Sequence, residues 1–428
     1  MNHRPYLAAL VARRVPVFYG WVVLGALCCT GFARQGPAVA TFSIFVEPLS
    51  HQFGWSRTAL SGAASLGGIL AAIAAPLIGT LLDRRGARVV LCSAVLTTGT
   101  ALLVLSLTPS LLVFYLLFCL ARMNWAAPFD LGLYGALNNW FVRQRTRASG
   151  IATLAQQLGL VAMPLVAEVA IVERGWRAGW LALGVVTLVV GFLPSWLFVV
   201  RRPEDLGLLP DGRSAPTGAA SPADPIALPE PRFSRREALA TPAFWLLLLF
   251  AMLVYPVQAG VSLHQAPFLI ERGIAPTIAA TIVSAFSAAS AVATVACGFL
   301  PRRVPIRYGL AATGAVLTLG VVLMLGVHTA AQGFVAAAMF GFGIGMILTF
   351  LPVAWADYFG RAHYGAIRGI ALPAQVVAQA AGPLLSGILH DLTGNYVWSL
   401  RCFAVLAALS LLAALAARQP APLLAAER

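Results

Sequence analysis

Apolar runs long enough to cross a lipid bilayer recur along the whole of this 428-residue chain. A transmembrane helix needs about 20 apolar residues, and these runs are too long and too uniform for strands, which alternate. Charged residues make up 10% of the sequence, against about 25% in soluble domains. The pattern predicts an all-α membrane protein with twelve transmembrane helices, at residues 18–46, 57–82, 88–107, 110–139, 147–170, 177–200, 243–267, 277–300, 309–327, 333–356, 368–389 and 398–417.

All 29 basic residues are arginines, and the net charge is +14. They gather in alternate loops, at 84–88, 143–147 and 302–307, as the positive-inside rule describes for loops that face the cytoplasm. Membrane topology therefore explains the charge, and we expect no nucleic-acid partner. We predict an integral protein of the bacterial inner (cytoplasmic) membrane, surrounded by the lipid bilayer, with both termini in the cytoplasm.

The expected spans fall into two sets of six, separated by a segment rich in proline, alanine and charge. We predict an N-terminal segment, a first six-helix half, a cytoplasmic linker, a second six-helix half and a C-terminal tail, at 1–17, 18–200, 201–242, 243–417 and 418–428. A repeat at an offset of 219 residues pairs Gly150, Gln156 and Pro164 with Gly369, Gln375 and Pro383. Two halves in pseudo-two-fold parallel repeat are typical of transporters that rock about a central site.

Metal, cofactor and enzyme chemistry have no signature in the sequence. The six cysteines lie in apolar runs without metal-ligand spacing. The chain has no lysine and hence no P-loop, and no HExxH or GxSxG motif occurs. We expect no cofactor, no metal and no catalytic residue. If the protein moves a solute uphill, an ion or solute gradient drives it, unless a partner supplies an ATPase.

A family signature follows the second expected span. The stretch GTLLDRRGAR, Gly79 to Arg88, resembles the G-x-L-x-D-R-x-G-R-R loop motif of the major facilitator superfamily, with Ala87 in place of the first closing arginine. The resemblance implies that superfamily's fold and a cytoplasmic gate. The gating residues would be Gly79, Asp83, Arg84, Gly86 and Arg88, with Arg143, Arg145 or Arg147 as basic partners of Asp83. The alternative is that these charges only set the topology.

A narrower resemblance points to the monocarboxylate and oxalate/formate transporter-like branch of that superfamily. The stretch NNWFVRQRTRASGIATLA, which enters the fifth span, is similar to the branch's pattern there. The resemblance implies a monomeric secondary transporter that moves a small organic anion by alternating access, with a proton or a counter-substrate. Thr294 stands where the branch usually carries a carboxylate-binding arginine in its eighth span. This departure argues against simple monocarboxylate transport.

Two arginines lie deep inside expected spans, Arg34 in the first and Arg122 in the fourth. A charge at mid-membrane costs at least about 2.5 kcal/mol on insertion scales, so such residues face a cavity or a partner. Three roles compete for Arg122: binding an anionic substrate, proton coupling, and a structural ion pair. Asp130 is the one acid well inside a span, and it is our candidate proton carrier, with a structural role as the alternative. Helical geometry turns it about 80° away from Arg122, so the two cannot pair directly.

Other polar side chains within the spans are candidate substrate contacts. Tyr115 shares a helix face with Arg122, and Ser290 and Thr294 lie one turn apart on the eighth span. The set also includes Gln156, Tyr255, Gln258, His264 and Gln375, although a lone histidine is more often packed or solvated than a ligand. Two rival functions stay open: an exporter of amphipathic drugs or metabolites, and a non-transporting membrane sensor.

Overall fold

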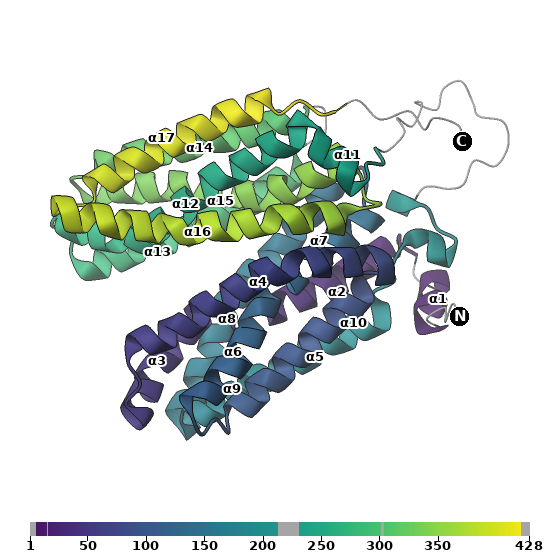
Figure 1. Cartoon of the computed structure of the whole chain (residues 1–428), viewed down its shortest axis with the longest axis horizontal. Helices are drawn as coiled ribbons and strands as arrows, with labels where there is room; N and C mark the ends of the chain where they lie inside the picture. The colour runs from purple at the N-terminus through teal and green to yellow at the C-terminus, as the bar shows by residue number, and fades with distance from the viewer. Residues whose placement is uncertain (1–5, 15, 213–230, 301–303, 421–428) are drawn as a thin grey trace. The chain divides into compact units, whose positions relative to one another are not determined.

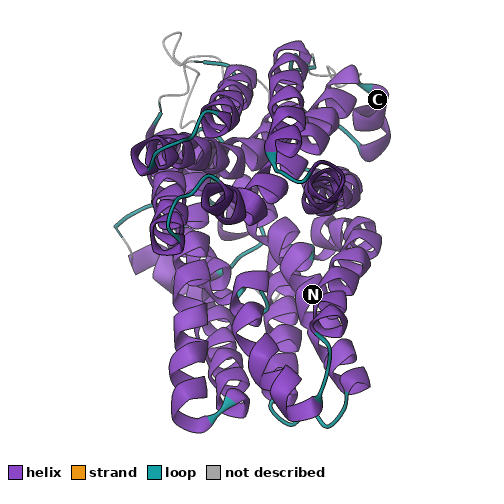
Figure 2. Cartoon of the chain, turned by 90° about the vertical axis from the view of Figure 1, so that its left-hand side faces the viewer, coloured by secondary structure: helices purple, strands orange, loops and turns teal. Residues whose placement is uncertain are grey.

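A computed structural model describes residues 6–14, 16–212, 231–300 and 304–420. Within these ranges the regular structure is entirely helical (Figure 2). Eleven of the described stretches are long and apolar enough to cross a membrane, and the shorter apolar helix α2 (Gly20–Ala33) marks the place of one more. The predicted all-α membrane architecture is confirmed.

The chain divides into two compact units, of which unit 1 comprises Met1–Glu230 and Arg361–Leu372. In unit 1, α2 packs against α8, α4 against α6, and α5 against α9. Its helices (Figure 1) are α1 (Tyr6–Arg14), α2, α3 (Val39–Phe53), α4 (Arg57–Arg85), α5 (Ala87–Leu105), α6 (Leu111–Ala126), α7 (Pro128–Trp140), α8 (Arg145–Arg174), α9 (Trp176–Val186), the π-helix η1 (Thr187–Phe192) and α10 (Leu193–Phe198).

Unit 2 comprises Pro231–Gly360 and Pro373–Arg428. Within it α13 and α14 both pack against α15, and α17 packs against α12 and α14. Its helices are α11 (Arg235–Ala240), α12 (Pro242–Glu271), α13 (Pro276–Phe299), α14 (Ile306–Leu325), α15 (Ala330–Phe359), α16 (Tyr364–Thr393) and α17 (Val397–Ala416). Helix α16 is divided, because its first turns belong to unit 1 and the rest belongs to unit 2.

The first expected span is broken, so the prediction of one continuous helix over 18–46 is wrong. Helix α2 ends at Ala33, and α3 begins at Val39 and runs on to Phe53. Pro37 explains the break, because it has no N–H to donate and disfavours helical conformation in the residue before it. Arg34 consequently caps the C-terminus of α2 instead of lying deep inside a continuous helix.

The fourth expected span is interrupted at Ala127, whose φ and ψ are −119° and −67°. Pro128 takes the first position of α7, where its missing N–H would have no helical partner in any case. The break therefore puts Asp130 in the first turn of α7, where the helix dipole favours a carboxylate.

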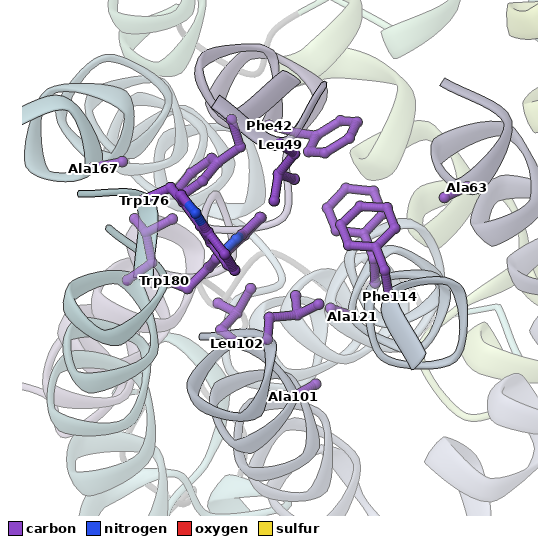
Figure 3. Packing of buried hydrophobic residues seen from close by; sticks show 14 of the residues in the cluster. Phe42, Leu49, Ala63, Ala101, Leu102, Phe114, Ala121, Ala167, Trp176 and Trp180 are labelled. Atoms are coloured by element: carbon purple, nitrogen blue, oxygen red, sulfur yellow. The ribbon is translucent and has the colours of Figure 1, made fainter. Parts of the chain in front are cut away.

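An aromatic core fixes α3 against α6 and α9 within unit 1 (Figure 3). The rings of Phe45 and Trp180 stack with their centroids 3.8 Å apart, and those of Phe42 and Phe118 lie 4.3 Å apart. Aromatic pairs of this kind contribute about 0.5–1.5 kcal/mol each beyond the burial of their surface. This packing holds α3, the second half of the broken first span, against α6 and α9.

The expected linker at 201–242 is partly ordered. It carries the short helices η2 (Pro203–Leu206), η3 (Pro210–Gly212) and α11, while residues 213–230 lie outside the described residues. The Asp211 carboxylate accepts hydrogen bonds from three successive backbone N–H groups, at 142–144, over 2.8–3.2 Å. The start of the linker is therefore tied to the loop that precedes α8. Residues 1–5, 15 and 421–428, in the predicted terminal segments, also lie outside the described part.

Candidate functional site

Arg34 and Arg122 meet at the indole of Trp125 in unit 1. Their guanidinium carbons lie 4.9 Å and 4.0 Å from the centroid of the Trp125 ring, which is the geometry of a cation–π contact. The indole Nε1–H donates to Gln35 Oε1 at 3.0 Å. Gln35 and Arg34 belong to the break between α2 and α3, so the interrupted helix brings this cationic group together.

Arg122 is held by stacking and packing rather than by an acid. Its Nε and Nη1 atoms are buried, and neither has a hydrogen-bond partner among the described residues. Its stem lies against Gly67 of α4, where a Cβ atom would come within 2.6 Å of the Arg122 Cβ. A buried guanidinium without a counter-charge is unfavourable in a medium of low dielectric constant. The arrangement therefore favours an anion from outside the protein.

Asp130 lies between Arg34 and a third arginine, Arg368. Its carboxylate oxygens are 3.8 Å from Arg34 Nη1 and 3.8 Å from Arg368 Nη2. Arg368 is buried on the first turns of α16. We call Arg34, Arg122, Trp125, Asp130 and Arg368 the arginine site.

A neutral network orients Arg34 in this site. Arg34 Nη1 donates to Gln156 Oε1 at 2.8 Å, and Gln156 Nε2 donates to the Tyr134 hydroxyl at 3.2 Å. The Tyr134 hydroxyl in turn lies 3.0 Å from Thr153 Oγ1. Gln156 therefore fixes one guanidinium through side chains of α7 and α8. Tyr115, by contrast, donates to the Ala59 carbonyl at 2.5 Å and ties α6 to α4.

Three residues of this neighbourhood were not among the sequence candidates: Trp125, Tyr134 and Arg368. Trp125 follows Arg122 by three residues on a helix, a spacing that places both on one face and could have identified it. Arg368 was taken as the first residue of a span, whereas α16 begins at Tyr364. Arg368 was therefore not counted among the arginines deep inside spans, and it is the fifth residue of α16.

The remaining substrate candidates belong to unit 2. Gln258 accepts a hydrogen bond from Gln379 Nε2 at 3.0 Å, and Thr294 Oγ1 donates to the Ser290 carbonyl of its own helix at 2.9 Å. Gln375 and Tyr255 are buried on α16 and α12. The unit 2 candidates are thus dispersed over α12, α13 and α16.

His264 lines a small pocket between α12, α16 and α17. Its Nε2 and both amide atoms of the neighbouring Gln265 are buried without a hydrogen-bond partner among the described residues. The His264 ring lies 5.0 Å from the ring of Tyr396. Burial raises the pKa of Tyr396, and the carboxylates of Glu271 and Asp391 raise it further. The cavity volume is about 10 Å³, roughly the space of one water molecule and far less than a ligand site offers.

The carboxylate of the expected gate residue Asp83 binds backbone N–H groups, while its backbone carbonyl accepts from Arg201 Nη2 at 2.5 Å. Its carboxylate oxygens accept from the N–H groups of Gly365 and Ala366, at 2.9 and 2.7 Å, in the first turn of α16. A carboxylate at a helix N-terminus satisfies donors that have no partner within the helix. A Cβ atom at Gly79 would collide with the Gly365 carbonyl, so glycine permits this close approach.

The basic gate candidates have other neighbours. Arg145 is buried, and its Nη2 lies 3.4 Å from the Asn138 carbonyl. Arg88 stacks on Trp196 with its guanidinium carbon 4.8 Å from the ring centroid. Arg84 and Arg143 are exposed, and Gly86 has φ +85° at the end of α4. The expected pairing of Asp83 with Arg143, Arg145 or Arg147 is therefore replaced by its bonds to the start of α16.

Arg361, three residues before α16, makes two further contacts near the start of this helix. It donates to the Asn139 carbonyl at 2.9 Å and forms an ion pair with Glu204 at 2.5 Å. Both partners come from unit 1, at the end of α7 and in the first part of the linker. The stretch RRPEDLG thus supplies an acid that the sequence analysis did not single out.

The sequence model of the Major Facilitator Superfamily matches residues 23–375. The chain is 26% identical over 393 residues to Monocarboxylate transporter 11 of Homo sapiens, covering 89% of this chain and 79% of that protein. It is 27% identical over 329 residues to Membrane sensor protein UhpC of Escherichia coli (strain K12), covering 73% of each. The solved structure of the proton:xylose symporter XylE bound to 6-bromo-6-deoxy-D-glucose superposes with a TM-score of 0.72 at 11% identity, covering 92% of this chain and 94% of that one.

Proposed function

The chain belongs to the Major Facilitator Superfamily, and from that premise we propose that it moves a small organic anion of the carboxylate class across the membrane. It is an integral membrane protein with the twelve-helix fold of a family of transporters rather than enzymes. We place it in the bacterial inner membrane, with both termini in the cytoplasm. It works as a monomer by alternating access, and a co-transported proton or an exchanged solute drives it.

The single observation that carries this proposal is the environment of Arg122. Its buried Nε and Nη1 have no protein partner among the described residues, and a second guanidinium lies against the same indole. A guanidinium can hold a carboxylate through two parallel hydrogen bonds. An anionic substrate at this point would supply the missing counter-charge. The similarity to Monocarboxylate transporter 11 supports a carboxylate as the anion.

Asp130 is the proposed carrier of a coupled proton. In its ionised form it interacts with Arg34 and Arg368. A substrate carboxylate that engages Arg34 competes with Asp130 for the same guanidinium. Uptake of the anion and of a proton are then linked through one shared arginine.

Asp83 is the proposed gate residue. It holds the first turn of α16 to unit 1, while the rest of that helix belongs to unit 2. Release of the two backbone hydrogen bonds would free the start of α16. The ion pair between Arg361 and Glu204 would have to open in the same step.

A membrane sensor is the second candidate function, because the chain is similar to Membrane sensor protein UhpC over 73% of its length. A sensor binds its ligand without moving it through the bilayer. Both candidates therefore predict binding, and only the transporter predicts flux.

The test is a thermal-shift screen followed by uptake into liposomes. Organic anions, amphipathic drugs and amino acids are screened against the purified protein, since a binder stabilises the native state by mass action. The best anion is then measured for uptake by the wild type, by Arg122→Gln and by Arg177→Gln. Arg177 is an exposed arginine that also stacks on a tryptophan, at 4.5 Å from Trp176, and serves as the matched control. We expect uptake by the wild type and the control only; binding without uptake in any of them would favour the sensor.

A further inference from the structure

We propose that the arginine site selects a dianion, a short dicarboxylate, over a monocarboxylate; this inference rests on the proposed transport of an organic anion. The site combines three guanidiniums, from Arg34, Arg122 and Arg368, with the one carboxylate of Asp130. Guanidinium groups stay protonated in proteins. These residues therefore carry two positive charges more than negative ones, and a dianion balances them.

The single acid of the site is already shared. Asp130 lies 3.8 Å from Arg34 and 3.8 Å from Arg368, so it serves two cations at once. The carboxylate of Asp83, a residue of α4, also lies near the first turn of α16. It already accepts hydrogen bonds from the backbone N–H groups of Gly365 and Ala366. Among the described residues no acid forms an ion pair with Arg122. The excess charge is therefore built into the site.

The spacing of the two stacked guanidiniums suits two separate carboxylates. Arg34 and Arg122 both have their guanidinium carbon within 5 Å of the Trp125 ring centroid, so these two carbons are less than 10 Å apart. Each guanidinium can take one carboxylate in a bidentate contact. Carbon–carbon bonds are about 1.5 Å long, so a diacid with a few carbon atoms between its carboxyl groups can bridge the pair.

A monocarboxylate would satisfy only one of the two stacked arginines. If it bound at Arg34, Arg122 would remain without an anion, and if it bound at Arg122, Arg34 would keep only the Asp130 carboxylate that it shares with Arg368. A compact dianion such as inorganic phosphate balances the charge but concentrates it on one centre. Two cations placed separately around one indole favour a ligand whose negative charges are also separate.

The test compares succinate with its monoamide, succinamate, which has the same length and one charge less. Binding to the purified full chain is measured by isothermal titration calorimetry at neutral pH. We expect succinate to bind about tenfold or more tightly than succinamate. In Arg122→Gln we expect the two ligands to bind within about twofold of each other, while Arg177→Gln keeps the full preference. Oxalate, malonate, glutarate and adipate complete the series, and the optimum is expected among the shorter diacids.

The wild-type comparison decides the inference even if Arg122→Gln does not fold. If succinamate or butyrate binds as tightly as the best diacid, the dianion proposal is overturned, although the proposed anion transport stands. If inorganic phosphate binds as tightly as that diacid and competes with it, the dicarboxylate assignment is wrong. If no carboxylate in either series binds, the proposed function fails as well.

Discussion

The guanidinium carbon of Arg122 lies 4.0 Å from the ring centroid of Trp125, about one helical turn further along α6. The same indole also receives Arg34 and is held in turn by Gln35. Trp125 thus fixes two cations that would otherwise repel each other. It is a positioning residue on which the proposed anion site depends.

Replacing this indole should weaken anion binding. Cation–π contacts contribute about 0.5–2 kcal/mol each, so Trp125→Leu should lower affinity by roughly 2- to 30-fold for each contact whose energy is lost. Trp125→Phe keeps a smaller aromatic face and loses the hydrogen bond to Gln35, so its effect should be smaller. Calorimetry on both variants checks this order. Equal affinity in Trp125→Leu and the wild type would mean that the stacking does not position the arginines.

A second variant tests the position of Arg122 without touching its charge. In Gly67→Ala the new methyl group would lie 2.6 Å from the Arg122 Cβ, so the arginine stem must shift. We expect about a tenfold loss of anion affinity, corresponding to ~1.4 kcal/mol. Alanine favours a helix by about 1 kcal/mol over glycine, so a loss of helix stability would not explain the result.

Gly25→Ala is the matched control for that substitution, since a Cβ atom at Gly25 meets no atom within 4 Å. Both variants are compared with the wild type in anion binding and in thermal stability. Unchanged affinity in Gly67→Ala, with normal stability, would show that Arg122 can move without consequence for the ligand.

If Asp130 carries the coupled proton, replacing it should leave anion binding intact but abolish accumulation of the anion driven by a pH gradient. Asp130→Asn removes the titratable group and its attraction to Arg34 and Arg368. Anion affinity should be retained or increased, because Arg34 no longer has a competing carboxylate. Accumulation driven by a pH gradient should be lost, whereas exchange of anion for anion should continue. Liposome uptake with and without a pH gradient distinguishes these outcomes, and gradient-driven accumulation by Asp130→Asn would exclude the residue as carrier.

The attachment of α16 predicts a defect in turnover. Asp83→Asn replaces one acceptor oxygen by an NH₂ group, so at least one of the two bonds to Gly365 and Ala366 is lost. Anion affinity should stay nearly unchanged, while the transport rate should fall several-fold because one conformation loses stabilisation. Asp391→Asn, at an acid with 86% of its side chain exposed, is the control. A normal rate in Asp83→Asn would leave this loop with a role in topology alone.

Composition and apolar run length predicted the all-helical membrane architecture, because each span must satisfy its own backbone within the bilayer. The loop motif at Gly79 to Arg88 predicted the superfamily. The break at Pro37 was missed, since the apolar run that defined the span continues on both sides of the proline. Arg368 was misjudged because helix ends cannot be located to within a turn from hydropathy. The partners of Asp83 were missed because every residue except proline carries a backbone N–H group, so the sequence does not show which of them a carboxylate binds.

The central claim is that Arg122 binds the anion, and the direct test is the dissociation constant of the best anion for Arg122→Gln, Arg122→Lys and Arg34→Gln. Lysine keeps the charge but cannot form two parallel hydrogen bonds, so Arg122→Lys should bind more weakly than the wild type and Arg122→Gln more weakly still. Arg34→Gln should show a separate loss. Calorimetry at several pH values gives these constants. Wild-type affinity in Arg122→Gln, with loss only of proton-driven accumulation, would contradict the claim and assign Arg122 to coupling instead.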